Sequence, residues 1–267
     1  MVTLAEMRMM KRNMRYTYGT GEVAAKRLEE IAKFFNPLSC KFICQFVKDP
    51  IPSAIDLGCG PGFTTNMLYN ALECSHVYGI DTSPHFLALA AQKFKHCAFI
   101  EHDVTVVPFP VQAEVIYVRF LLSHCGDVIA LVNRWTTQLL EKGKLLIEEL
   151  ESIDTVVPAF KEYLEINDAL IASQGASLYV GSTLGSGLYE ATLLCNECIA
   201  MSVANYQAAT WFYPNTISIW EQEQYVLDRV SPLRRKNISK EILKIKESRD
   251  PAMDSTWKIR RLVLECH

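Results

Sequence analysis

Residues 55–62 read Ile55-Asp56-Leu57-Gly58-Cys59-Gly60-Pro61-Gly62, or IDLGCGPG. Three glycines stand at every second position, directly behind a short apolar run that contains an aspartate. Glycine adopts backbone angles that other residues resist, and it lets another group approach the main chain without meeting a Cβ atom. We therefore expect a tight turn from a strand into a helix, at a place where a ligand comes close. A tight turn without a ligand is the alternative that this stretch alone leaves open.

The sequence around this turn alternates between short apolar runs and helical patterns. The apolar runs are 53–57, 76–80, 97–101, 113–118 and 144–149, and the helical stretches are 63–74, 84–94 and 127–140. Continuous apolar strands that alternate with helices are typical of parallel strands buried on both faces. Right-handed crossovers build such strands into a doubly wound sheet, whose ligands bind at the carboxyl edge. The glycines follow the first strand at that edge.

The flanking segments complete the expected fold. A helix over 21–36 is expected to end at Pro37, and a second helix covers 38–47. Beyond 149 we predict a helix at 158–173, a loop at 174–190, a strand within 196–206, helices at 216–230 and 238–249, and a final strand at 257–266. The fold class is thus α/β, a doubly wound Rossmann-like sheet of seven mostly parallel strands. We expect one domain over 1–267, with a helical cap or lid (1–48), a cofactor-binding core (50–150) and a substrate-side insertion (151–267).

Composition narrows the class of protein. The 267 residues carry a net charge of −3, which gives no basic footprint for nucleic acid. No apolar run approaches the roughly 20 residues needed to span a bilayer. The nine cysteines are scattered, and Cys195-x-x-Cys198 has no second pair to complete a zinc site. We expect free thiols in a reducing cytoplasm, no bound metal, and neither a nucleic acid nor a membrane as partner.

The glycine spacing distinguishes between cofactor classes. Gly58-x-Gly60-x-Gly62, with Asp56 two residues earlier, differs from the G-x-G-x-x-G of dinucleotide-binding proteins. It resembles the first motif of class I S-adenosylmethionine-dependent methyltransferases, D/E-x-G-x-G-x-G. Over residues 50–150 other positions fit that family in order, which implies S-adenosyl-L-methionine as cofactor and S-adenosyl-L-homocysteine as product. Farther out, Tyr18-Gly19 and Leu178-Tyr179 resemble metabolite-methylating members more loosely.

The resemblance also implies which residues hold the cofactor. Asp81, at the end of the second strand, is expected to accept hydrogen bonds from both ribose hydroxyls; a helix N-cap is its alternative, although Ser83-Pro84 already supplies one. Asp103 and the backbone of Val104 are expected to contact adenine, or else to cap a loop. The full expected set is Tyr18, Asp56, Gly58, Gly60, Gly62, Asp81, Thr82, Asp103, Val104 and Arg119.

The segment after the fourth strand, Arg119-Phe120-Leu121-Leu122-Ser123-His124, contains the candidate catalytic residues. His124 is a candidate general base, whose unperturbed pKa of about 6.5 predicts one ionisation near neutrality; packing under a helix is its alternative. Arg119 either binds an acidic substrate group or braces the cofactor pocket. Of Glu148 and Glu149, one is expected to face the cleft, unless both cap the sheet edge.

The expected substrate-side residues are aromatic: Tyr16, Tyr179, Trp211 and Tyr213, with Phe212 and Trp220 in the same aromatic cluster as Trp211. An aromatic wall suits an apolar or planar acceptor, but packing of the insertion onto the sheet explains such residues equally well. The resulting hypothesis is an enzyme, a monomer or homodimer of secondary metabolism, that methylates a small-molecule metabolite at O, N or S. The alternative is a protein of the same fold that binds the cofactor but catalyses a rearrangement, or that serves as a subunit of a partner enzyme.

Overall fold

The structure is a computed structural model that describes residues 19–266, without the side chains of 213–217. Within this range one sheet contains seven strands in the order β3-β2-β1-β4-β5-β7-β6. The strands are β1 (Ser53–Leu57), β2 (His76–Asp81), β3 (Ala98–Glu101), β4 (Ala113–Arg119), β5 (Leu139–Asp154), β6 (Thr192–Val203) and β7 (Ser255–Glu265). The first five are parallel, while β7 runs antiparallel to both β5 and β6. The predicted α/β sheet of seven mostly parallel strands is therefore confirmed.

Strand pairing brings the candidate loops together. Leu57, the last residue of β1, pairs with Ile80 of β2 on one side and with Val118 of β4 on the other. All five residues of β1 are buried, as expected for a central parallel strand. The turns after β1, β2 and β4 consequently leave the same edge of the sheet side by side.

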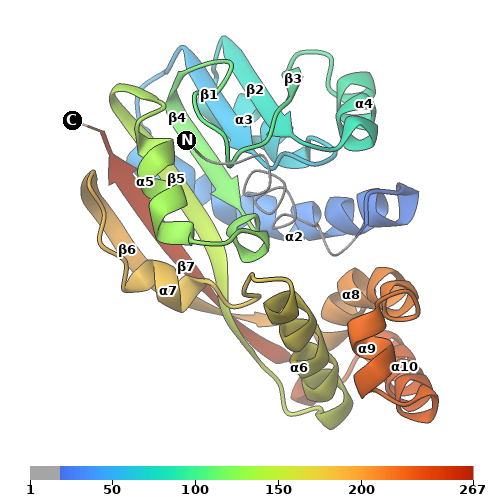
Figure 1. Ribbon diagram of the computed structural model, residues 1–267. Coiled ribbons are helices and arrows are strands. Elements are labelled where there is room, and N and C mark those ends of the chain that lie inside the picture. Colours follow the sequence, from blue (N-terminus) through green and yellow to red (C-terminus); the bar gives the residue numbers. More distant parts are fainter. Residues whose placement is uncertain (1–18, 267) are drawn as a thin grey trace, which may run out of the picture.

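Helices cover both faces of the sheet (Figure 1). Those of the first half are α2 (Glu22–Phe46), α3 (Phe63–Leu72), α4 (Pro84–Lys93) and α5 (Val128–Thr136), with the short 3-10 helix η1 (Leu122–His124) between β4 and α5. Those of the second half are α6 (Pro158–Ser173), α7 (Gly181–Gly185), α8 (Asn205–Trp220), α9 (Gln224–Arg229), α10 (Pro232–Glu247) and the 3-10 helix η2 (Pro251–Met253). No helix of the described part is long and apolar enough to cross a membrane.

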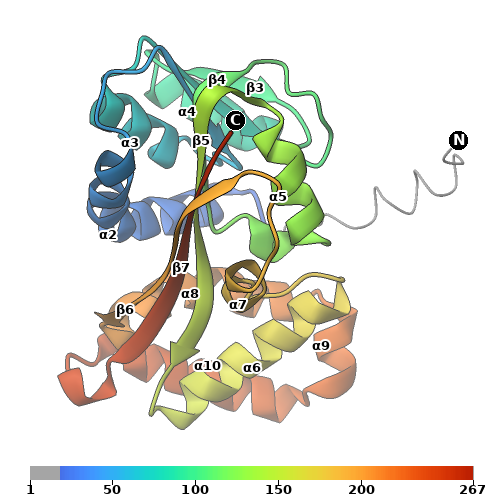
Figure 2. The same cartoon turned by 90° about the vertical axis from the view of Figure 1, so that its left-hand side faces the viewer.

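The long strands β5 and β7 reach well beyond the parallel part of the sheet. Figure 2 shows them running down to a lower layer that is built from α6, α8, α9 and α10. A single buried cluster joins these helices to the far ends of the strands, with Leu150 and Ile153 from β5 and Trp257 and Ile259 from β7. The predicted insertion after the fifth strand thus shares its core with the extended strands.

The prediction that Pro37 ends a helix was wrong, because α2 continues through it. An interior proline removes one backbone hydrogen bond and costs about 3 kcal/mol. Burial on both sides of the proline offsets this cost: Phe35 precedes it, and Phe42 and Ile43 follow it, all three almost fully buried. Arg119 also bonds α2 on both sides of Pro37, since its guanidinium donates to Asn36 Oδ1 at 2.8 Å and to Ser39 Oγ at 2.9 Å.

Several predicted boundaries also moved. The segment 216–230 is not one helix, because α8 ends at Trp220 and α9 begins at Gln224. Strand β6 begins at Thr192, four residues before the predicted range, and β5 extends on both sides of 144–149. Pairing with β7, whose partners run from Thr192 to Val203 and from Lys144 to Asp154, extends β6 and the carboxyl end of β5, while Leu139 at the start of β5 pairs with Ala113 of β4.

Candidate functional site

A cavity of about 210 Å³ opens beside α2, at the edge of the sheet where β1, β2 and β4 end. Its lining residues fall into three groups. The polar part includes Thr20, Gly58, Gly60, Thr64, Asp81 and Thr82. The intermediate part includes Arg27, Arg119, Ser123 and His124. The apolar part includes Phe35, Phe120, Leu150, Leu178, Phe212 and Trp257. Six predicted site residues are thereby brought together: Gly58, Gly60, Asp81, Thr82, Arg119 and His124.

The glycine turn has the backbone that its sequence predicts. Gly58, Gly60 and Gly62 have φ angles of 68°, 49° and 82°, in the left-handed region that favours glycine. A Cβ atom on Gly60 would have only ordinary contacts, 3.5 Å from Leu28 Cδ1 and 3.8 Å from a Phe86 ring carbon. Since Gly60 lines the cavity, its missing side chain leaves room for a ligand at the backbone.

Asp81 ties two of the lining loops together. One carboxylate oxygen accepts a hydrogen bond from the Gly60 backbone N–H at 2.9 Å, and the other accepts from the Ser83 N–H at 2.8 Å. Burial raises the pKa of this carboxyl, although the backbone donors oppose the shift. The N-cap of α4 is Ser83, whose hydroxyl accepts from the Phe86 N–H, so Asp81 is not needed for that task.

Gly62 and Asp56 lie next to the turn but do not line the cavity. A Cβ atom on Gly62 would lie 2.9 Å from Ala90 Cβ and 3.0 Å from the Phe99 ring, so this glycine lets α4 and β3 pack against the turn. The buried Asp56 carboxylate accepts from the hydroxyls of Thr64 and Thr65 at 2.5 and 2.7 Å. Burial raises its pKa to about 6. Both residues support the turn from behind.

The two residues predicted to contact adenine are also placed behind the cavity wall. The Asp103 carboxylate accepts from the backbone N–H of Thr105 at 2.9 Å and from its hydroxyl at 2.7 Å, which makes it the cap of its own loop. Val104 is a core residue that is 2% exposed. Neither residue lines the cavity, so their predicted contact with adenine stays a prediction.

His124 lines the cavity from η1 but is 8% exposed. Burial, and secondly the positive charge of Arg27, lowers its pKa to about 4. The expectation of an ionisation near neutrality was therefore wrong, because a desolvated imidazole next to a guanidinium resists a second positive charge. At neutral pH His124 is therefore an uncharged ring in the wall of the cavity.

Glu148 and Glu149 lie within β5, and neither lines the cavity, contrary to the expectation that one would. The Glu148 carboxylate accepts from Tyr117 Oη at 2.7 Å and from Arg261 Nε at 2.9 Å. Glu149 is fully buried, and one of its oxygens accepts from the backbone N–H groups of Leu121 and Leu122, each at 2.7 Å. Glu149 thereby fixes the start of η1, the element that carries His124.

The two predicted substrate-side residues whose side chains the structure describes, Trp211 and Tyr179, do not line the cavity. Trp211 is 2% exposed within the lower core and borders a small surface groove between α2 and α8. Tyr179 is half-buried and does not line the cavity, although its neighbour Leu178 does. Tyr16 and Tyr18 lie outside the described residues, as does the side chain of Tyr213.

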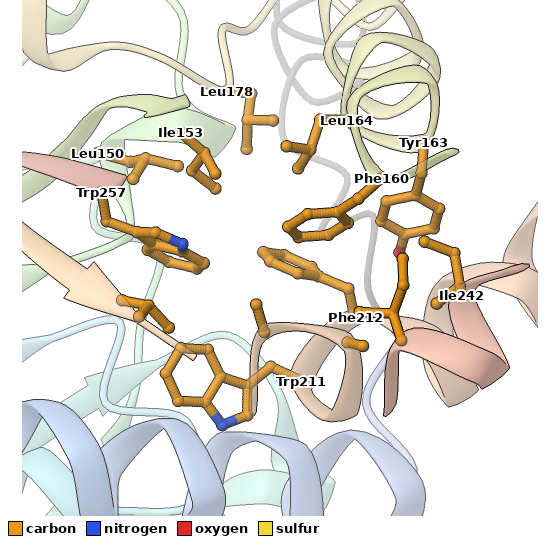
Figure 3. Close-up of a cluster of buried hydrophobic side chains, with 14 of the residues drawn as sticks. Leu150, Ile153, Phe160, Tyr163, Leu164, Leu178, Trp211, Phe212, Ile242 and Trp257 are labelled. Carbon is orange, nitrogen blue, oxygen red and sulfur yellow. The ribbon is translucent and has the colours of Figure 1, made fainter. Parts of the chain in front are cut away.

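Sequence reasoning missed most of the apolar wall. Figure 3 shows Phe212 of α8 beside Trp257 of β7. Leu150 lies next to Trp257 in this view, and Leu178 lies at the upper side of the same cluster. Phe212 belongs to the aromatic cluster that the sequence suggested as an acceptor wall, and it lines the cavity. The other residues look like ordinary core positions in the sequence, since buried aromatic and aliphatic residues are the rule in any domain. Arg27 was also not among the predicted site residues, although Arg27-Leu28 fits the N-terminal pattern of metabolite-methylating members.

Comparisons with known proteins agree with this site. A family model described as a methyltransferase domain matches residues 54–143. Trans-aconitate 2-methyltransferase of Klebsiella pneumoniae (strain 342) is 35% identical over 98 residues, and that of Yersinia pestis is 33% identical over 99. Each match covers 37% of this chain and 39% or 38% of the relative, so the chain spans about two fifths of the length of these curated relatives.

Solved structures share the fold at low sequence identity. Coclaurine N-methyltransferase, bound to N-methylheliamine and SAH, aligns with a TM-score of 0.55 at 12% identity, over 86% of this chain and 72% of its own. A structure described as a putative methyltransferase of Bacillus halodurans aligns with a TM-score of 0.55 at 12% identity, over 85% of this chain and 97% of its own. Both carry the same α/β architecture.

The seven-stranded sheet and the turn after its first strand have the α/β architecture of these methyltransferase structures. Residues 54–143 are the segment of this chain that matches the methyltransferase-domain family. They hold the glycine turn, Asp81, Arg119 and His124, whereas α2 and the lower helical layer lie outside the match.

Proposed function

We propose that this protein transfers a methyl group from S-adenosylmethionine to an O, N or S atom of a small-molecule acceptor. The observation that carries the proposal is the hydrogen bond between Gly60 and Asp81 on one wall of a cavity that continues into an apolar chamber. The two parts of the cavity match the two molecules that a methyl transfer must bring together. S-adenosylmethionine, when bound, supplies a methyl group that is already activated by the sulfonium.

The polar part of the cavity fits such a cofactor. An ionised carboxylate offers about four acceptor positions, and the backbone N–H groups of Gly60 and Ser83 occupy one on each oxygen of Asp81. The positions that remain suit ribose hydroxyls, the contact that the sequence predicts. The open backbone at Gly60 suits close approach by the cofactor, and Arg27 supplies a cation for its carboxylate. Thr82 and Gly58 complete this part of the wall.

We assign the chain's own residues mainly to positioning. Holding an activated methyl group and its acceptor in line is itself a large part of catalysis. His124 faces the cavity as a neutral imidazole, which accepts a hydrogen bond from an acceptor hydroxyl. Arg119 lines the cavity while it is hydrogen-bonded to α2, so its role is to brace the wall rather than to bind an acidic substrate group.

A two-stage experiment tests the proposal. Calorimetry should first show binding of S-adenosylmethionine and of S-adenosylhomocysteine to the purified protein. Incubation with a methyl-labelled donor and a set of small-molecule acceptors should then give a product that has gained one labelled methyl group, as measured by mass spectrometry. A product of unchanged formula would identify a rearrangement instead, and absence of cofactor binding would contradict the proposal altogether.

We extend the proposal to the setting of the reaction. All nine cysteines are free thiols, which supports a reducing compartment, and we propose the cytoplasm. A net charge of −3 supports a small metabolite, rather than a nucleic acid or a membrane, as the partner. We further propose a role in secondary metabolism and an assembly no larger than a homodimer; size-exclusion chromatography with light scattering measures the latter.

A further inference from the structure

The two parts of the cavity are separated along α2. Leu28 lies against the glycine turn, 3.5 Å from the position of a Gly60 Cβ, whereas Phe35 belongs to the apolar part. Seven residues of α-helix span about 10 Å, so the apolar part begins roughly that far from the turn. This distance leaves room in the apolar part for a second molecule beside one that binds at Gly60 and Asp81.

The apolar part presents carbon atoms on several sides. Its six residues come from α2, the loop after β4, β5, the loop before α7, α8 and β7: Phe35, Phe120, Leu150, Leu178, Phe212 and Trp257. Phe212 and Trp257 are stacked, with ring centroids 5.8 Å apart and an interplanar angle of 26° (Figure 3). Phe35 meets Phe120 edge-on at 5.0 Å. The indole N–H of Trp257 donates to Ser255 Oγ, so this polar atom already has a partner.

Among the residues that the structure describes, the cation that borders this part of the cavity, Arg119, does not make it a carboxylate site. Arg119 lies 5.9 Å from the centre of the Phe120 ring, and two of its nitrogens donate to Asn36 and Ser39 of α2. A carboxylate that enters an apolar space without its own donors loses its hydration and is strongly disfavoured. The chemistry of the wall therefore selects an uncharged body.

We propose that the methyl acceptor is a molecule with a flat, uncharged, hydrocarbon-rich body and a single polar atom that receives the methyl group. Its body occupies the chamber formed by Phe35, Phe120, Leu150, Leu178, Phe212 and Trp257, and its polar atom is directed to His124. This inference rests on the proposed function. It separates the chain from its trans-aconitate-methylating relatives, whose named substrate carries several carboxylates.

The family match does not carry the relatives' substrate to this chain. The match ends at residue 143, whereas Leu150, Leu178, Phe212 and Trp257 lie beyond it and Phe35 lies before it. Thus five of the six chamber residues are outside the segment that the family shares. The matched segment contains the glycine turn and Asp81, whereas most of the chamber comes from residues outside it.

Calorimetry on the full chain, loaded with S-adenosylhomocysteine, tests the inference with two probes. The first is 1-naphthol, a flat neutral aromatic with one hydroxyl, and the second is trans-aconitate. We expect 1-naphthol to bind and trans-aconitate to bind more weakly or not at all. Phe212→Leu should weaken 1-naphthol binding about two- to tenfold, the range typical of a lost ring contact, with the affinity for S-adenosylhomocysteine unchanged.

A matched control separates the chamber from the surrounding core. Phe160→Leu removes the same ring from a residue of the same cluster that is fully buried and does not line the cavity, so 1-naphthol binding should not change. If Phe212→Leu does not fold, Leu178→Ala replaces it. Tighter binding of trans-aconitate than of 1-naphthol would overturn the inference, as would equal effects of Phe212→Leu and Phe160→Leu. 1-Naphthol binding is also measured in cofactor-free protein, so that the two proposals are tested separately. Loss of S-adenosylhomocysteine binding to the wild type would contradict the proposed function and not the inference about the acceptor.

Discussion

The backbone N–H of Gly60 donates a 2.9 Å hydrogen bond to the carboxylate of Asp81, and this bond joins the turn after β1 to the end of β2. The same carboxylate accepts from the Ser83 N–H at the start of α4. One side chain therefore shapes two loops of the cavity and still has acceptor positions to offer a ligand. The Asp81 carboxylate therefore stabilises two loops of the fold and is at the same time part of the candidate site.

Replacing Asp81 should weaken cofactor binding. Asp81→Ala removes the acceptor for the Gly60 N–H and the acceptor that we assign to the ribose hydroxyls. Hydrogen bonds to charged groups are worth roughly 1.5–3 kcal/mol, so affinity for S-adenosylhomocysteine should fall about tenfold to a hundredfold. Calorimetry measures this change. Asp127→Ala, which removes a helix-capping carboxylate from α5, is the control and should bind normally; equal affinity of a folded Asp81→Ala variant would exclude Asp81 from the site.

Gly60 and Gly62 should respond differently to the same substitution. In Gly60→Ala the new Cβ atom enters the cavity with only ordinary contacts, so binding should be lost while the strained φ angle costs about 1–2 kcal/mol of stability. In Gly62→Ala the Cβ atom lies 2.9 Å from Ala90 Cβ, and overpacking of this kind typically costs about 1–3 kcal/mol. Urea unfolding and calorimetry on both variants separate the two roles. Normal cofactor binding by Gly60→Ala would mean that the glycines form a tight turn that no ligand contacts.

Local patterns were enough to predict the sheet and its ligand edge. The apolar run 53–57, the glycine turn and Asp81 are each decided within a few residues, because strand burial and positive φ angles leave direct traces in sequence. The prediction at Pro37 failed because the helix is held by residues from distant parts of the chain. Arg119 is the clearest case, since it bonds α2 on both sides of the proline.

The apolar chamber was not predictable for a related reason. Phe35 and Trp257 are far apart in sequence, yet their ring centroids lie 6.0 Å apart. An aromatic residue that lines a cavity and one that fills a core have the same hydrophobic pattern in sequence. The extension of β5 and β7 beyond the parallel strands determines which of these residues line the cavity. Trp211 and Phe212 make the point, since these neighbours in α8 take opposite roles.

Glu149 should make the stability of the protein fall as pH rises. Burial raises its pKa to about 8, above its ordinary value near 4.5. Its stabilising contribution is therefore full below about pH 4.5 and is lost as pH rises through 8, at about 1.4 kcal/mol for each pKa unit of difference. Glu149→Gln keeps an acceptor for the Leu121 and Leu122 N–H groups without an ionisation, so its advantage over wild type should grow between pH 5 and pH 8.

Thermal unfolding at both pH values measures the effect of Glu149→Gln. Glu148→Gln is the neighbouring control: it weakens the ion pair with Arg261 and should lower stability at both pH values. A constant difference between Glu149→Gln and wild type across this range would show that Glu149 is already ionised in the folded protein at pH 5.

His124 should reveal its role in the pH dependence of turnover. Because its pKa is lowered to about 4, it is neutral at pH 6 to 8, and turnover should be flat over that range with respect to this group. Below pH 6, protonation turns the unprotonated ring nitrogen into a donor, so it no longer accepts a hydrogen bond from the methyl acceptor. The value of kcat should therefore fall through one ionisation near pH 4. The folded state also loses stability as pH falls from 6.5 towards 4, since the unfolded chain binds the proton more readily. Rates must therefore be measured where circular dichroism shows the protein folded.

Substitution separates catalysis from packing at this position. General-base assistance is typically worth about 10²–10⁴ in rate, and a base with so low a pKa should give less, so His124→Ala should lower kcat about tenfold to a hundredfold. Affinity for S-adenosylhomocysteine should stay unchanged, and the ionisation near pH 4 should disappear from the rate profile. His124→Gln, which keeps a neutral acceptor, should recover part of the loss. If His124→Ala retains full turnover, or if the acid ionisation persists without the imidazole, the acceptor atom needs no partner at this position, and methyl transfer then relies on positioning alone.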